Sequence, residues 1–270
     1  MVQIAPLYLF LILTISTALI AGLATYLFNK KIQVKVLRSH NEVTGFIFLA
    51  ITSFYALLLS FVVFIVWGQL NQTRANASNE GSSAMGLYRD IKYYPDPIAS
   101  KKIMTAYLNY VYFVVDEEFP NMAIMKLSRK TPESLSRVYY EIENLKPGST
   151  FQSQLVTEMF NHLNQLDSFR GQRIMSIETE VPAPIWFPLI IGAIITVICS
   201  MLLDIEHRKV HIAINSMLGA FIGMFFFIII LLDHPYTGHI GIKPKAYKEI
   251  FTMEETSSDV QQKQIIQSHK

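Results

Sequence analysis

Residues 44–67 read TGFIFLAITSFYALLLSFVVFIVW, a run of 24 residues without a single Asp, Glu, Lys or Arg. An α-helix rises about 1.5 Å per residue, so this run is long enough to cross a hydrocarbon core of about 30 Å. Three further charge-free runs occur at 6–28, 185–203 and 210–232. The four runs predict an all-α integral membrane protein with four transmembrane helices.

The composition of the whole chain agrees with a membrane protein. Among its 270 residues, 51% are hydrophobic and 16% are charged, whereas about a quarter of a soluble protein is charged. The formal net charge of +2 gives no support for nucleic-acid binding. Cys199 is the single cysteine, so no internal disulfide can form.

The remaining sequence divides around these runs. Transmembrane helices 1 and 2 occupy 1–68, and transmembrane helices 3 and 4 occupy 185–232. Residues 69–184 carry 12 Lys and Arg against 13 Asp and Glu, and helix start signals such as Asp96-Pro97 recur in them. We therefore predict a helical soluble domain inserted between helices 2 and 3. The polar C-terminal tail, 233–270, is expected to be disordered from 254 onwards.

The second run is expected to continue beyond the membrane. Between Trp67 and Tyr94 there is no proline, and three glycines weaken a helix without ending it. One long helix should therefore connect the membrane part with the soluble domain.

Motifs of enzymes and cofactor sites are absent from the sequence, so we expect no enzyme activity, no cofactor and no metal. Two clusters come nearest to a metal site. Asp116, Glu117 and Glu118 are consecutive and point around a helix, which is typical of a solvated helix end. His207 and His211 share a helix face but lack the HExxH order, and they fall at an interfacial turn.

The four runs contain no ionisable carboxylate, lysine or arginine, which argues against proton-coupled carriers, because these need such groups at membrane depth. A channel can instead gate at a hydrophobic constriction. Helical spacing places Ser53, Ala56 or Leu57, Ser60 and Phe64 on one face of the second run, with Phe61 close by. We interpret this face as pore-lining with a hydrophobic neck; contact with lipid is the alternative.

Small residues in the runs, such as Gly219-x-x-x-Gly223, allow helices to approach closely. They fit packing within one subunit or an oligomer interface. Arg170 and Arg173 are expected to pair with Glu80 or Glu118, with surface or headgroup contact as the alternative.

The order and spacing of several short motifs resemble the bacterial bestrophin-like membrane family over about residues 5–250. These motifs are His40-Asn41-Glu42-Val43-x-Gly45, Tyr55, Trp67, Glu80, Leu87-Tyr88, Glu118-Phe119-Pro120, Arg170-x-x-Arg173, Trp186 and Asp233-x-Pro235-x-x-Gly238.

The resemblance implies a pentameric ion channel with four membrane helices per subunit, a cytosolic helical domain between the second and third, and a pore lined by the second. It favours an oligomeric channel of the bacterial inner membrane whose partners are the lipid bilayer, other copies of the chain and inorganic ions. His40, Asn41 and Glu42 would lie at the pore mouth. Structural polar contacts are expected from Glu80, Glu118, Arg170, Arg173 and Asp233.

Two points differ from the animal channels of this kind. The basic short loops 29–43 and 204–209 predict that both termini and the 69–184 domain lie outside the cytoplasm. No acidic calcium-binding run follows the fourth membrane segment, so calcium gating is not expected. The alternative function is a membrane-anchored sensor or scaffold whose helical domain binds a partner without conducting ions.

Overall fold

The computed structural model describes residues 6–31, 38–177, 181–237 and 241–268, with the side chains of all but 38, 39 and 257–268. Regular structure in this part of the chain is helical throughout. Residues 32–37 of the first basic loop and Gly238, the last residue of the motif that begins at Asp233, lie outside the described residues.

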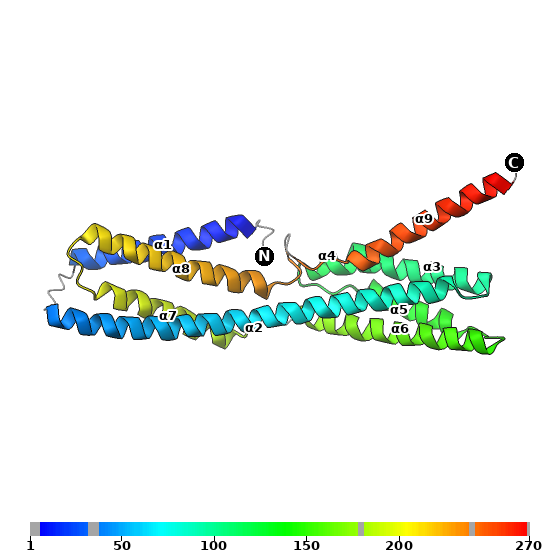
Figure 1. Cartoon of the computed structure of the whole chain (residues 1–270), viewed down its shortest axis with the longest axis horizontal. Helices are drawn as coiled ribbons and strands as arrows, with labels where there is room; N and C mark the ends of the chain where they lie inside the picture. The colour runs from blue at the N-terminus through cyan, green and yellow to red at the C-terminus, as the bar shows by residue number, and fades with distance from the viewer. Residues whose placement is uncertain (1–5, 32–37, 178–180, 238–240, 269–270) are drawn as a thin grey trace. The chain divides into compact units, whose positions relative to one another are not determined.

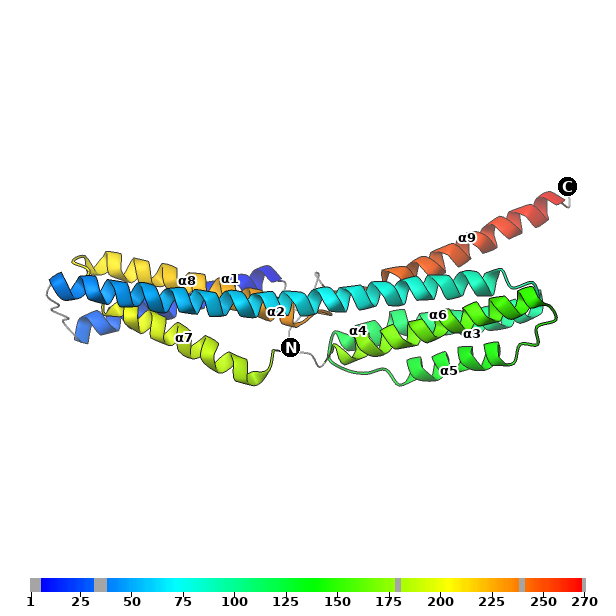
Figure 2. The same ribbon diagram turned by 60° about the horizontal axis from the view of Figure 1, so that its bottom comes forward.

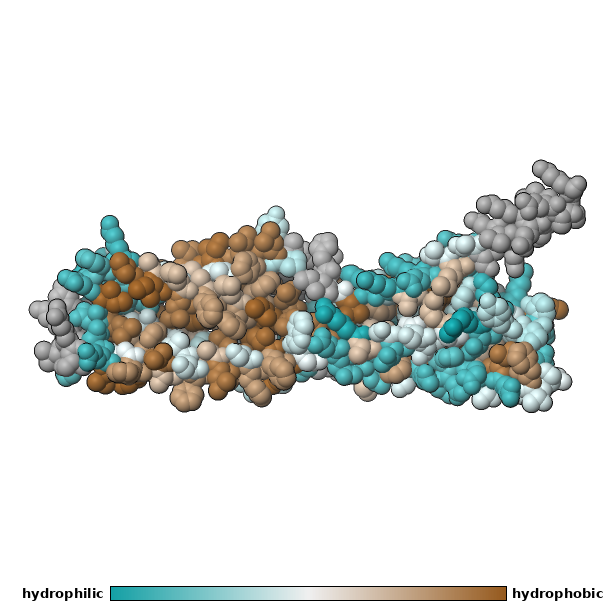
Figure 3. Space-filling model, in the orientation of Figure 1, coloured by the Kyte–Doolittle hydropathy of each residue, from teal (hydrophilic) through white to brown (hydrophobic). Residues whose placement is uncertain are grey.

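Four helices are long and apolar enough to cross a membrane: α1 (Pro6–Lys31), α2 (Arg38–Lys92), α7 (Ala183–Met201) and α8 (Arg208–Asp233). The surface over the apolar helices is mainly hydrophobic, coloured brown in Figure 3. These findings confirm the prediction of an all-helical chain with four such helices.

Helix α2 is a single element of 55 residues, as the lack of a breaker after Trp67 predicts. At about 1.5 Å per residue it is about 80 Å long, more than twice the thickness of a hydrocarbon core. Residues 43–73 of this helix carry no charged side chain, whereas charged residues recur from Arg74 onwards, so one helix carries both the apolar run and a polar extension.

The other helices are α3 (Pro97–Phe113), the π-helical turn η1 (Val114–Glu118), α4 (Phe119–Met122), α5 (Lys130–Glu143), α6 (Thr150–Met175) and α9 (Lys245–Ser268). Side-chain caps begin two of them. Asp96 accepts hydrogen bonds from the backbone N–H groups of Ile98 and Ala99, and Ser149 accepts one from Gln152.

Helix α9 corrects the expectation of a disordered tail, because it extends through Ser268. The polar composition of 254–270 suggested disorder, but this stretch continues a helix whose earlier residues Tyr247 and Ile250 are buried. Glu254 also accepts a hydrogen bond from the Tyr88 hydroxyl at 2.7 Å. The first part of α9 is thus anchored on the polar unit, and the helix continues from there.

The chain forms two compact units, and α2 contributes to both. The span unit comprises the described residues of 2–70 and 179–239, and the polar unit those of 71–178 and 240–270. In the polar unit, α3, α5 and α6 lie along the second half of α2 (Figure 2). Tyr107, Tyr110, Val138 and Leu163 are among its fully buried core residues.

In the span unit, α1 and α8 run side by side (Figure 1). Glycine permits their close approach. A Cβ atom on Gly219 would lie 2.5 Å from the carbonyl oxygen of Thr17 and 2.7 Å from Cβ of Ala21. This helix pair therefore depends on the absence of a side chain at Gly219.

Candidate functional site

The proposed neck residues lie on an exposed face of α2. Leu57, Phe61 and Phe64 are 67%, 61% and 73% exposed in the single chain. Ser53 and Ser60 are also exposed and continue the same stripe at helical spacing. Large apolar side chains that are exposed to this extent are suited to contact lipid or other subunits, or to line a narrow pore.

The opposite face of α2 is the one that packs within the span unit, which leaves the stripe exposed. Tyr55, Leu59, Val62 and Val66 recur at helical spacing and form a core with residues of α7 and α8, including Leu189, Ile222 and Ile229. The Tyr55 hydroxyl donates to the carbonyl oxygen of Leu189 at 3.1 Å. Within the span unit, α2 is thus fixed through one face and presents the other outward.

The predicted pore-mouth residues begin α2. His40 and Glu42 are exposed, whereas Asn41 is half-buried and binds the turn between α7 and α8. Its amide oxygen accepts from the backbone N–H of Asp204 at 3.0 Å, and its amide nitrogen donates to the Asp204 carbonyl at 3.3 Å. This geometry gives Asn41 a positioning role at this end of the span unit.

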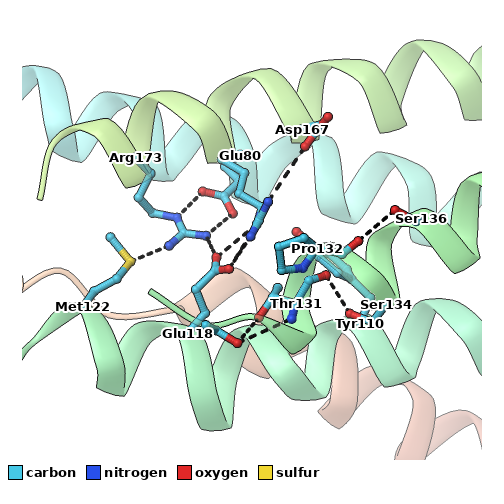
Figure 4. A network of polar contacts seen from close by, with 12 residues as sticks. Glu80, Tyr110, Glu118, Met122, Thr131, Pro132, Ser134, Ser136, Asp167 and Arg173 are labelled. Atoms are coloured by element: carbon cyan, nitrogen blue, oxygen red, sulfur yellow. Dashed lines mark hydrogen bonds and ion pairs between the residues drawn. The ribbon is translucent and has the colours of Figure 1, made fainter. Parts of the chain in front are cut away.

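A network of buried charges lies in the polar unit (Figure 4). Arg173 of α6 donates from Nε to Oε2 of Glu80 at 2.5 Å and from Nη2 to Oε1 of Glu80 at 2.8 Å. Nη2 also donates to Oε1 of Glu118 at 2.5 Å. Glu118 accepts in addition from Arg170, at 3.1 Å and 3.2 Å from its Nε. All four predicted side chains are brought together.

Three further residues complete the network, and only Phe119 among them belongs to a motif noted in the sequence. The hydroxyl of Tyr247 in α9 donates to Oε1 of Glu80 at 2.7 Å. The sulfur of Met122 lies 2.6 Å from Nη1 of Arg173, and the Phe119 ring centroid lies 4.4 Å from its Cζ. The network therefore joins α2, α4, α6, η1 and α9.

Electrostatics keep this network charged. Burial by itself would raise the pKa of the Glu118 carboxyl, but the charges of Arg173 and Arg170 and their hydrogen bonds outweigh it and hold the pKa below its usual value. Burial likewise opposes the charge of Arg173, and Glu80 outweighs it, so the guanidinium pKa is raised. Both groups are ionised at neutral pH.

Asp233 ends α8, and its carboxylate accepts a hydrogen bond from the backbone. It is 7% exposed, and its Oδ1 accepts from the backbone N–H of Val181 at 2.7 Å. This bond connects the end of α8 to the segment that enters α7. The residue is thus placed to fix the path of the chain.

A second polar cluster lies between the apolar helices α1, α7 and α8. The Asn215 amide nitrogen donates to the Thr25 hydroxyl at 2.9 Å, and Asn215 Oδ1 accepts from the Ser200 hydroxyl. His211 Nε2 lies 3.0 Å from the Ser200 carbonyl and its Nδ1 lies 3.3 Å from Asn29 Nδ2. Each polar group is satisfied within the bundle, as lipid surroundings require.

No part of the described structure gathers three or more His, Cys, Asp or Glu side chains that could hold a metal ion. His211 is occupied by the contacts above. The expectation that Asp116, Glu117 and Glu118 form a solvated helix end is wrong for Glu118, which is buried in the network around Arg173. Glu117 pairs with Lys130 at 2.6 Å. The ion pairs and hydrogen bonds described above are suited to packing and to fixing helices relative to one another.

A family model described as a Bestrophin-like domain matches residues 13–247. No curated protein matches the chain.

Solved structures of a bacterial bestrophin homologue from Klebsiella pneumoniae share its fold. A single-mutant form has a TM-score of 0.60 at 14% identity, covering 91% of this chain and 97% of that one. A structure of the homologue determined by Zn-SAD phasing has a TM-score of 0.60 at 15% identity, covering 90% and 95%.

Proposed function

The chain belongs to the bestrophin-like family, and from this membership we propose that it forms an oligomeric ion channel, a homopentamer, in the bacterial inner membrane. Each subunit would contribute four membrane-spanning helices, and the polar unit would form a soluble helical domain inserted between the second and third. Inorganic ions, the lipid bilayer and further copies of the chain are the partners in this proposal.

The observation that carries the proposal is the outward face of α2. One subunit supplies one such helix, and its other face is already packed against α7 and α8. A pore requires a ring of similar helices, so a channel needs several copies. Phe61 and Phe64 would then line a neck from which water is easily expelled, which is how apolar constrictions gate.

The network around Arg173 would hold α2 in a fixed position within the soluble domain. Glu80 lies on the same helix as Phe61 and Phe64, 16 to 19 residues further along the chain. Because α2 contributes to both units, we expect substitutions around Glu80 to affect the neck as well. His40 and Glu42, both exposed at the start of α2, would contact ions at the mouth.

The test is electrical. Purified protein is placed in a planar bilayer with opposed gradients of sodium, potassium and chloride. We expect discrete unitary currents, and replacement of Phe61 and Phe64 by Ala should raise the conductance or hold the channel open. Val62→Ala and Val66→Ala, on the packed face of the same helix, are the controls. A silent bilayer for both the native chain and the double variant would refute the channel.

The compact core of the polar unit supports a second candidate. Its helices bury a continuous set of apolar side chains without help from the span unit, as expected of a domain that binds a partner. In that case the four apolar helices only anchor a sensor or scaffold. Absence of current together with a monomeric or dimeric state would favour this alternative.

A further inference from the structure

A cavity of about 250 Å³ lies between α1, α7 and α8 in the span unit. Small residues form part of its wall, among them Ala21 and Ala24 of α1, Ala193 of α7 and Gly219 of α8. Its side chains are apolar apart from the hydroxyl of Thr17, which bonds to the carbonyl of Leu13. Such a wall offers dispersion contacts and no polar anchor.

The rim of the cavity faces the surroundings of the helix bundle. Ile20, Ile194 and Ile198 line the cavity and are 66%, 52% and 49% exposed. All three lie within charge-free runs. At this depth of a membrane the medium outside the rim is hydrocarbon, so an acyl chain can enter sideways without crossing a polar surface.

One end of the cavity points towards a group of basic residues. Lys30 and Lys31 end α1, and Arg208 and Lys209 begin α8. The contact between Asn29 and His211 brings these two helix ends together, and all four basic residues are exposed. Asp204 and Glu206 precede α8, so four positive groups face two negative ones.

Distances along α1 match an amphiphilic ligand. Cavity-lining residues extend from Thr17 to Ala24, which is about 10 Å of helix, and Lys30 follows about 9 Å beyond Ala24. The Thr25–Asn215–Ser200–His211 cluster fills the interval between the helices but uses its polar groups internally. Lysine side chains can extend to a headgroup while their methylenes remain along apolar surface.

We propose that this cavity is a binding site for an anionic glycerophospholipid, with one acyl chain in the slot between α1, α7 and α8 and its phosphate at Lys30, Lys31, Arg208 and Lys209. The site is distinct from the α2 face and does not depend on ion conduction. A bound acyl chain would connect α1 with α7, two helices that have few direct contacts with each other.

The experiment uses the full chain in nanodiscs of equal phosphatidylglycerol and phosphatidylcholine, followed by native mass spectrometry. We expect phosphatidylglycerol adducts on each chain. Ala193→Phe fills the slot and should remove them, whereas Ile195→Phe, two residues away and outside the cavity, should not. Ala24→Leu fills the slot from α1 and serves if Ala193→Phe loses helical content. Replacing Lys30 and Lys31 by Ala should reduce the preference for phosphatidylglycerol about tenfold.

Three results would overturn the proposal. Adducts retained by both slot-filling variants at the level of the native chain would place the lipid elsewhere. Equal retention of the two lipids by the native chain would remove the role of the basic residues. A native chain without any adduct would show that the cavity does not hold a lipid.

Discussion

Arg173 meets the carboxylate of Glu80 through two parallel hydrogen bonds, at 2.5 Å and 2.8 Å, and neither side chain is exposed to solvent beyond 1%. Paired geometry of this kind is the strongest that a carboxylate and a guanidinium can form. Two charges removed from water depend on each other, because either one alone would be buried without compensation.

Replacing Arg173 by Met should destabilise the polar unit by about 3–5 kcal/mol, because Glu80 and Glu118 would face each other without their shared cation. Thermal or denaturant unfolding in detergent measures the change. Lys130→Ala is the matched control: it removes the exposed ion pair with Glu117 and should leave the midpoint nearly unchanged. Equal effects of the two substitutions would contradict the buried network.

The lowered pKa of Glu118 predicts how stability depends on acid. A carboxyl whose pKa is lower in the folded chain contributes stability above its unfolded pKa, about 4.3, and loses that contribution as the pH falls through the folded value. The temperature or denaturant concentration at the unfolding midpoint should therefore decrease as the pH is lowered below about 4.3. Glu118→Gln should lower the unfolding midpoint at neutral pH and make its decrease in acid less steep. If the midpoint of the variant decreases as steeply as that of the native chain, other carboxyl groups cause the acid dependence.

Much of the fold could be predicted because its signals are local. Charge-free runs identify the apolar helices, the lack of a breaker after Trp67 predicts the continuous α2, and Asp96-Pro97 marks a helix start. The tail from 254 onwards was misjudged because its composition was considered alone, whereas it continues a helix that is anchored earlier, at Tyr247 and Ile250.

The sites were less predictable because they depend on contacts between distant residues. Charge and spacing indicated Arg170 and Arg173, but Tyr247 contacts Glu80 across 167 positions of sequence, and no local pattern links them. Asn41 resembled a mouth residue, and only the fold shows its bonds to Asp204. The cavity is lined by residues of three helices, α1, α7 and α8, and no sequence motif marks it.

Gly219→Ala should destabilise the span unit by about 1–3 kcal/mol, because the new methyl group would meet the Thr17 carbonyl and Ala21 across the α1–α8 contact. Gly171→Ala in α6 is the control, since a Cβ there meets nothing within 4 Å. An alanine within a helix should be neutral or slightly stabilising at that position. If Gly219→Ala unfolds at the same temperature as the native chain, α1 and α8 are not held by this close approach.

Ser53 offers a direct test of whether the exposed face of α2 meets water. In a Cys199→Ser background, Ser53→Cys should react with a charged, membrane-impermeant thiol reagent, because a pore would hydrate the thiol and allow the reactive thiolate to form. Ile195→Cys, exposed on α7, should react far more slowly, since hydrocarbon keeps a thiol protonated. Reaction at Ser53→Cys should also change the conductance. Equal, slow labelling at both positions would place this face of α2 in lipid and would remove Ser53, Leu57, Ser60, Phe61 and Phe64 from the pore.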